Sequence, residues 1–334
     1  MNNTINRRKV NLIIIILSLV SILFIIGSLA VGYYKITLTE IISFLFQGKD
    51  SVKEEIVIII QRIRLPRIIA AFFIGAGLSI AGASFQGMFK NPLVSPDILG
   101  VVSGAGFGAA LAISLKLNNF YIQLLAFLFG IIFVTLAYFI GTRTKYNQEI
   151  SLILAGTMLG TLATSLTTLL KYVASPNDTL PNITYWLMGS LSRVNNNSLL
   201  FSIIPIIIGT VILYLLRWQL NILTLGDEEA LALGIEPKKV RLIAIFASTI
   251  ISAASVCLGG IIGWVGLMIP HIARSIIGAD YRYLLPVSFL LGGSYLLVMD
   301  DLARSLLTIE IPLGVLTSVL GAPFFIVLIL GREK

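Results

Sequence analysis

The stretch VNLIIIILSLVSILFIIGSLAV, residues 10–31, decides the class of protein to which this chain belongs. It follows the basic residues Arg7, Arg8 and Lys9 and carries no charged side chain. A helix of about 20 apolar residues crosses a bilayer, so this stretch is long enough to span one. A secretory signal peptide is the alternative, but its apolar core usually has only about 7–15 residues. We therefore predict a retained membrane helix with a cytoplasmic N-terminus.

The composition of the whole chain agrees with this first stretch. Of its 334 residues, 57% are hydrophobic and only 12% are charged, and the mean hydropathy is +0.97. A soluble domain has about 25% charged residues, so we predict a multi-spanning membrane protein with one helical domain over residues 1–334. The net charge of +8 would suggest nucleic acid as the partner of a soluble protein. In a membrane protein it reflects topology, and we expect no nucleic-acid partner.

Apolar segments predict about ten crossings. After the first, they lie at about 66–88, 95–115, 119–141, 149–172, 198–217, 239–261, 264–278, 281–300 and 312–331. The segment at 264–278 is short and holds Pro270, so we interpret it as a short or tilted crossing. Ten crossings place both termini in the cytoplasm, and most basic loop residues then lie inside. Arg62, Arg64 and Arg67 lie outside on this topology and need their own explanation.

The chain also repeats itself weakly, with an offset of 174 residues. In this register Arg67–Phe72 parallels Arg241–Phe246, Leu93–Pro96 parallels Leu267–Pro270, and Gly104 parallels Gly278. Each match alone is at chance level, but three in one register favour a duplication. Two halves of five crossings must have opposite orientations because five is odd. The prediction is therefore two inverted five-helix halves, the plan of many transporters.

Few side chains are suited to catalysis. One cysteine, Cys257, and one histidine, His271, exclude a disulfide framework and a metal site built from several such residues. We assign packing to Cys257 and a structural role to His271, for which a proton relay or a haem ligand is the alternative. There is no Walker A sequence. We expect no cofactor, no resident metal and no nucleotide hydrolysis by this chain, and a membrane-embedded enzyme fits poorly.

Two further patterns concern the interior of the bundle. Glycines recur at GxxxG spacing, as at Gly104 and Gly108, which lets helices approach closely in lipid. A phosphate-binding loop is the alternative there, but no strand precedes these glycines. No acidic residue lies at the middle of a predicted span; Asp97 begins a predicted helix, and Asp300 and Asp301 end one. This disfavours an ion-coupled secondary transporter, which we keep as the alternative function, and favours an external energy source.

A polar segment, LGDEEALALGIEP at residues 225–237, stands in a loop of about 221–240 with basic flanks. Asp227, Glu228 and Glu229 suit the first turn of a short helix, and Gly234 suits its end. An ordinary solvated loop is the alternative. A short capped helix on the cytoplasmic face is what a partner protein would need to push on.

Several stretches carry a family resemblance, in order along nearly the whole chain. They are Arg64–Arg67, Gly82–Gln86, Asn91–Pro96 with Leu99 and Gly100, Tyr185–Ser190, Leu225–Gly234, Gly263–Arg274, Asp301–Arg304, Pro312–Thr317 and Gly321–Phe324. Together they resemble the FecCD permeases, the membrane subunits of type II ABC importers for iron-siderophore, haem and vitamin B12. Met299-Asp300 departs from the family, which usually has a small residue before the position of Asp301. The match is specific for the family and weak for the substrate.

The resemblance implies the type II ABC importer permease fold, an all-α membrane protein in the cell membrane. It implies a second permease copy or a paralogue, two ABC ATPase subunits inside and an extracytoplasmic substrate-binding protein outside. The cargo would be an iron chelate, with a ferric siderophore ahead of haem or cobalamin, and it would pass between the two permeases.

The resemblance and the residues together give three candidate sites. Docking of the binding protein falls on Arg64, Arg67 and Arg304, whose guanidinium groups suit bidentate bonds to carboxylates. The alternative is that they bind lipid phosphates or pair with Asp300, Asp301 or Glu310. Coupling to the ATPase falls on the predicted short helix, at Gly226, Asp227, Glu228, Ala230, Leu233 and Gly234.

The third candidate site is an inner gate. Its predicted residues are Asn91, Pro92, Leu93 and Pro96, with Glu149 and Ile150 at the start of the fifth crossing. Pro92 and Pro96 interrupt regular helix, so the backbone can bend there. The alternative is a plain turn.

Overall fold

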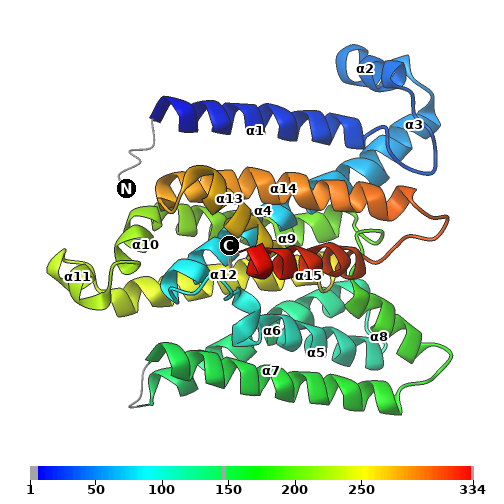
Figure 1. Cartoon of the computed structure of the whole chain (residues 1–334). Helices are drawn as coiled ribbons and strands as arrows, with labels where there is room; N and C mark the ends of the chain where they lie inside the picture. The colour runs from blue at the N-terminus through cyan, green and yellow to red at the C-terminus, as the bar shows by residue number, and fades with distance from the viewer. Residues whose placement is uncertain (1–6, 145–147, 332–334) are drawn as a thin grey trace.

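The first apolar stretch forms one helix, α1 (Arg7–Ser28), in a computed structural model that describes residues 7–144 and 148–331. It lies along α14 (Tyr281–Ser305) at the edge of the bundle (Figure 1). Leu12, Leu19 and Leu23 on α1 are each more than half exposed. Such an apolar, exposed helix suits a lipid surface and not water.

The described chain folds into helices, and no strand occurs within the described ranges. The helices after α1 are α2 (Leu38–Gln47), α3 (Glu54–Ile58), α4 (Leu65–Met88), α5 (Val101–Ser114), α6 (Asn119–Thr142), α7 (Gln148–Val173), α8 (Thr179–Met188), α9 (Asn196–Leu215), α10 (Arg217–Leu223), α11 (Asp227–Ala232), α12 (Pro237–Gly259), α13 (Val265–Ile277), α14 and α15 (Leu313–Gly331). Two 3₁₀ turns, η1 (Lys49–Ser51) and η3 (Pro96–Leu99), and a π-helical turn, η2 (Ile59–Arg64), join some of them.

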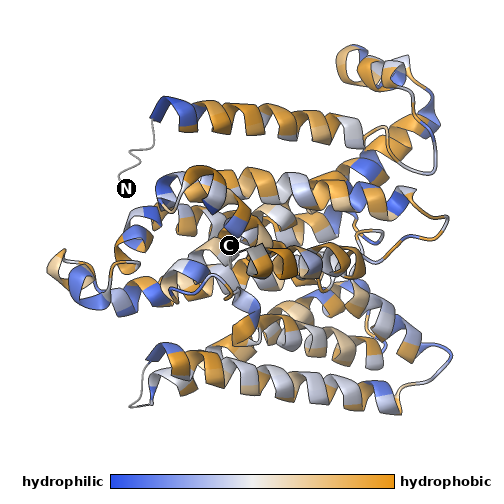
Figure 2. Ribbon diagram, viewed as in Figure 1, coloured by the Kyte–Doolittle hydropathy of each residue, from blue (hydrophilic) through white to orange (hydrophobic). Residues whose placement is uncertain are grey.

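Seven helical stretches are long and apolar enough to cross a membrane: α1, the continuous α3–η2–α4 stretch, α6, α7, α9, α12 and α14. The shorter apolar helices α5, α13 and α15 follow the same axis (Figure 1). With them, the described residues form the ten predicted crossings. Hydrophilic residues gather at the two ends of the bundle (Figure 2), as a membrane-spanning protein requires.

The two ends carry different elements. The start of α1, α10 and α11 lie at one end, here called the α11 end, and α2, α3 and α8 lie at the other, the α2 end (Figure 1). The central helices α4 and α12 are the best buried of the long helices, with 83% and 78% of their most apolar windows inside the bundle. They begin at opposite ends (Figure 1). This antiparallel core confirms the two inverted halves.

Glycines allow the close packing of this core. A Cβ atom on Gly82 of α4 would lie 1.8 Å from the carbonyl oxygen of Gly266 in α13, and one on Gly108 of α5 would lie 2.3 Å from that of Leu125 in α6. The run from Gly104 to Gly108 is therefore a helix-packing face, as predicted, and lies wholly inside α5.

The structure corrects several predicted boundaries. The second crossing begins at Glu54, so Arg62 and Arg64 lie in helical turns and not in a loop, and α14 continues to Ser305 and includes Arg304. Hydropathy places a boundary at the first charged residues, whereas the helix continues through them: Arg64 donates to backbone carbonyl oxygens and Arg304 pairs with Asp301. Helices α2, α8 and α10 were not predicted from the sequence. The capping box of α2 was visible as Thr37-Leu38-Thr39-Glu40.

Candidate functional site

Arg67 anchors a cluster of charged groups at the α2 end. It is 6% exposed and lies in the first turn of α4. Its Nε and Nη2 atoms donate to the fully buried carboxylate of Asp300 at 2.9 Å each, and Nη1 donates to Glu310 Oε1 at 2.7 Å. Only Glu310 is well exposed in this group, with 40% of its side chain accessible.

Two further arginines complete this α2-end cluster. Arg304 donates through Nη2 to Asp301 and to the Ser28 carbonyl oxygen, the latter at 2.8 Å. Arg64 is 3% exposed and donates to the carbonyl oxygens of Leu29 and Tyr34. The three predicted docking arginines thus converge. Within this chain all three are bonded internally. Arg67 and Arg304 pair with Asp300, Asp301 and Glu310, the alternative stated for them above, whereas Arg64 bonds to backbone carbonyl oxygens.

The predicted coupling segment forms α10 and α11 at the α11 end. Asp227 begins α11, and Gly234 follows it with φ +76°, a left-handed conformation that favours glycine. Ala230 is fully buried and donates its N–H to the carbonyl oxygen of Gly226 at 3.1 Å. Ala230, one of the predicted coupling residues, therefore packs against the core and has no exposed side chain to present to a partner.

The exposed apolar surface of this segment consists of leucines. Leu225, Leu231 and Leu233 are 65%, 60% and 55% exposed, beside the exposed carboxylates of Glu228 and Glu229. These leucines lie on the segment predicted to contact the ATPase, and that contact stays a prediction. We call these three side chains the leucine patch.

Arg241, in the first turns of α12, connects the coupling segment to α7. It is 6% exposed. Its Nη1 and Nη2 atoms donate to both carboxylate oxygens of Asp227 at 2.7 Å, and Nη2 also donates to Glu149 Oε1 at 2.7 Å. The bond from Arg241 holds the pKa of the Asp227 carboxyl below its usual value. Arg241 had no predicted role, although Arg241 corresponds to Arg67 in the repeat with an offset of 174 residues.

The predicted gate residues flank the start of α5 and α7. The Asn91 side chain accepts the N–H of Leu93 at 2.9 Å in the turn after α4, and Leu93 is 58% exposed. Pro96 is buried and begins η3. Helix is interrupted between Met88 and Val101, with only η3 between them, as predicted. Ile150 in the first turn of α7 is 56% exposed. The gate itself stays a prediction.

A groove of about 390 Å³, lined by hydroxyls and by apolar atoms, runs between α7 and η3. Its polar lining is Asp97, Ser103, Thr157, Thr161, Thr164, Ser165 and Thr168. The threonine hydroxyls donate to their own helix, as Thr161 does to the Thr157 carbonyl oxygen at 2.9 Å, so their acceptor sites stay open. A row of hydroxyls along a membrane-spanning helix suits water or a polar cargo better than lipid. We call this feature the α7 groove.

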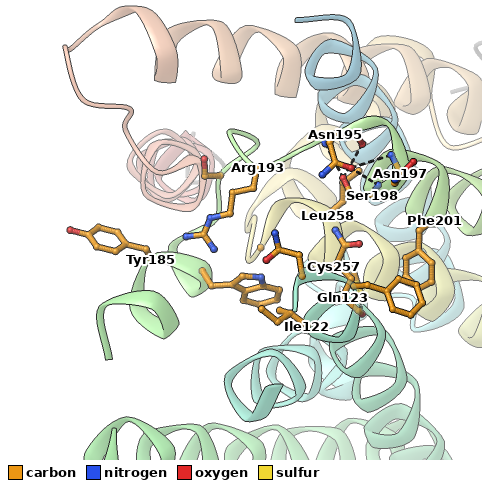
Figure 3. Close-up of a pocket in the computed structure, with 15 residues that line it drawn as sticks. Ile122, Gln123, Tyr185, Arg193, Asn195, Asn197, Ser198, Phe201, Cys257 and Leu258 are labelled. Carbon is orange, nitrogen blue, oxygen red and sulfur yellow. Dashed lines mark hydrogen bonds between the residues drawn. The ribbon is translucent and has the colours of Figure 1, made fainter. Parts of the chain in front are cut away.

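A second hollow of about 440 Å³ lies at the α2 end among α6, α8, α9 and the end of α12 (Figure 3). Amide side chains and Arg193 line it, and Cys257 is buried beneath, donating its thiol to the Gln123 carbonyl oxygen at 3.2 Å. His271 lies elsewhere, with its ring against Phe324 and Phe325. Residues 7–144 and 148–331 contain no group of three or more His, Cys, Asp or Glu side chains that could hold a metal ion.

Ten crossings in inverted halves, with a hydroxyl-lined groove along one of the spans, are the architecture of a membrane permease. The sequence profile of the FecCD transport family matches residues 18–331. The chain belongs to this family, whose members are the membrane permease subunits of ABC importers.

Two relatives and one solved structure show how close the similarity is. The chain is 40% identical over 325 residues to the molybdate import system permease protein MolB of Haemophilus influenzae. This match covers 95% of each chain. It is 42% identical over 269 residues to a protein of Helicobacter pylori named a probable iron chelatin transport system permease protein, covering 80% of this chain and 81% of the relative. A metal-chelate type ABC transporter, solved in an inward-facing conformation, superimposes with a TM-score of 0.87 at 37% identity, over 96% of this chain and 99% of the other.

Proposed function

We propose that residues 1–334 work as one permease domain that carries an iron chelate into the cell, with a ferric siderophore ahead of haem or cobalamin. The α7 groove is the observation that carries the transport part, because its hydroxyls lie open on the side of a single chain. A second permease copy or a paralogue would cover this face, and the two grooves together would enclose the pathway. Hydroxyls hold a polar cargo weakly, which suits passage better than storage.

The choice of cargo rests on similarity. The relative from Helicobacter pylori and the inward-facing structure are named for iron chelatin and for metal chelates. Molybdate is the second candidate, because the relative named for it matches 95% of this chain at 40% identity.

The energy would come from two ABC ATPase subunits docked on the leucine patch and the carboxylates of α11. This chain would hydrolyse no ATP itself. The α11 end would face the cytoplasm, because α1 begins there with the basic residues Arg7, Arg8 and Lys9. The chain would then lie in the cell membrane with both termini inside.

An extracytoplasmic binding protein would dock at the α2 end. Within this chain Arg64, Arg67 and Arg304 are already bonded, so a docking carboxylate would have to replace Glu310, the exposed member of the cluster. The Arg67–Asp300 pair would stay in place beneath it.

Reconstitution in liposomes with the ATPase and the binding protein tests the proposal. We expect ATP-dependent uptake of a labelled ferric chelate and none with the ATPase omitted. Uptake of labelled molybdate in its place would support the second candidate. Uptake driven by a proton or sodium gradient without the ATPase would overturn the importer and support a secondary transporter.

A further inference from the structure

We propose that Arg241 is the residue that transmits movement of α11 to the first turn of α7. The inference rests on the proposed function, since it assumes that an ATPase pushes on α11. It adds a positioning residue that neither the sequence motifs nor the family match singles out.

The bonds of Arg241 give it this role. One guanidinium group contacts three elements: it belongs to α12, binds both oxygens of Asp227 at the start of α11, and binds Glu149 at the start of α7. The Nη2 atom is shared between the two carboxylates. Among the described residues its Nε atom has no hydrogen-bond partner. The hydrogen bonds found for this side chain are thus all directed at α11 and α7.

The partners differ in how firmly they are held. Arg241 itself is buried in α12, which is a fixed part of the core. The side chains of Asp227 and Glu149 are 48% and 30% exposed. A displacement of α11 therefore moves Asp227 relative to the guanidinium group of Arg241. If the guanidinium group follows Asp227, Glu149 must move with it or lose its hydrogen bond to Arg241.

The second charged cluster offers an internal comparison. Arg67 occupies the matching repeat position at the opposite end and also binds two carboxylates, those of Asp300 and Glu310. There the carboxylate on the neighbouring helix, Asp300, is fully buried. The α2-end bridge is therefore anchored in the core, whereas both carboxylates of the α11-end bridge are partly exposed and able to shift.

Arginine chemistry makes the proposal specific. A guanidinium group binds one carboxylate through two parallel bonds and still reaches a second, whereas an ammonium group is a single point charge. Arg241→Lys keeps the buried positive charge and removes this geometry. Arg241→Gln removes both. Glu149→Gln removes the charge that Arg241 meets on α7. Arg282→Gln, which breaks the exposed Arg282–Asp280 pair, serves as the control.

The experiment measures ATP hydrolysis and uptake together in liposomes that hold the complete importer. We expect Arg241→Lys and Glu149→Gln to keep ATP hydrolysis within about twofold while uptake falls at least tenfold, and Arg282→Gln to change neither. A purely structural residue would lower hydrolysis and uptake together, through loss of assembled complex, and that result would overturn the proposal.

A distance measurement keeps the test decisive if the variants assemble poorly. Spin labels on Ala232→Cys at the end of α11 and on Leu154→Cys of α7, in a Cys257→Ser background, report the separation of α11 and α7. With Arg241 intact, we expect this separation to stay constant between the ADP and ATP states while α11 moves relative to α4. A separation that changes with the nucleotide in the intact protein would overturn the inference. Absence of any ATP-driven uptake in the unmodified protein would overturn the proposed function itself.

Discussion

At the scale of single residues, the Arg67–Asp300 pair governs the stability of the α2 end. Removing one partner of a buried ion pair leaves the other charge without compensation, which costs about 3–5 kcal/mol. We expect Arg67→Gln to destabilise the protein by about this amount, and Arg67→Gln with Asp300→Asn to recover part of it. Thermal unfolding of the purified protein in detergent measures both. Arg282→Gln is the control, because an exposed pair contributes only about 0–1 kcal/mol, and an equal loss in that variant would contradict the account.

Glu310 provides a second prediction at this scale, for docking of the binding protein. Its carboxylate accepts a hydrogen bond from Nη1 of Arg67. A carboxylate of the binding protein would have to bind at the same atom. Glu310→Gln removes this competing charge and leaves Arg67–Asp300 in place. We expect tighter binding and a faster association rate that depends more strongly on salt, because exposed charges act mainly on encounter.

Affinity of the binding protein for the reconstituted permease across a salt series checks this prediction. Charge reversal of the arginines, as in Arg67→Glu with Arg304→Glu, is a weaker test, since it also places new carboxylates beside Asp300 and Asp301 and unfolds the cluster. An unchanged affinity and salt dependence in Glu310→Gln would remove the reason for placing docking at Arg67.

At the scale of elements, α11 has one side that packs against the core and one side that is exposed to a partner. Leu231 and Leu233 are exposed, whereas Ala230 is fully buried. We expect Leu231→Asp with Leu233→Asp to abolish ATPase binding while the permease keeps its thermal stability. Ala230→Asp should instead destabilise the segment, because it places a charge in an apolar site. Co-purification of the ATPase and unfolding temperature separate the two effects, and ATPase binding that survives in the double variant would contradict the docking surface.

Packing of α4 on α13 depends on the lack of a side chain at Gly82. An added Cβ would lie 1.8 Å from the Gly266 carbonyl oxygen, so the helices must separate. Overpacking typically costs about 1–3 kcal/mol, and we expect Gly82→Ala to cost at least that much. Gly27→Ala on α1 is the matched control, since open space surrounds it and alanine favours helix by up to about 1 kcal/mol. Thermal unfolding measures both; equal stabilities would show that the close approach is unimportant.

At the scale of the whole molecule, the gate prediction needs two copies of the chain. Leu93 is exposed in the turn after α4, so a cysteine there is accessible. We expect Leu93→Cys in a Cys257→Ser background to cross-link between two permeases and to stop uptake, and reduction to restore it. Uptake that continues after complete cross-linking would exclude Leu93 from the gate. Exposed Phe120→Cys at the α2 end controls for the effect of the thiol reagent.

The sequence alone was enough for the architecture of this protein. Hydropathy is a local property, so the apolar runs predicted the crossings, and the boundaries of α6, α7, α9, α12, α13 and α15 differ from the prediction by only a few residues. Capping is also local. Asp227 at the start of α11, Gly234 after it and the helix break around Pro96 all followed from neighbouring residues. The inverted halves followed from an odd number of crossings in each repeat.

The tertiary structure alone decided which charges are available and which are already bonded. Arg67 and Asp300 lie 233 residues apart in the chain, and Arg241 and Glu149 lie 92 apart, so no local pattern determines either pair. The predicted topology offered Asp300 only as one of several alternative partners of Arg67. Arg64 and Arg67, which were predicted to bind a docking protein, are buried and bonded within the chain, and Arg241, which carried no motif, joins α11 to α7. The physical reason is that burying a charge in a low-dielectric interior is costly unless an opposite charge meets it there, and only the packing of distant helices determines where they meet.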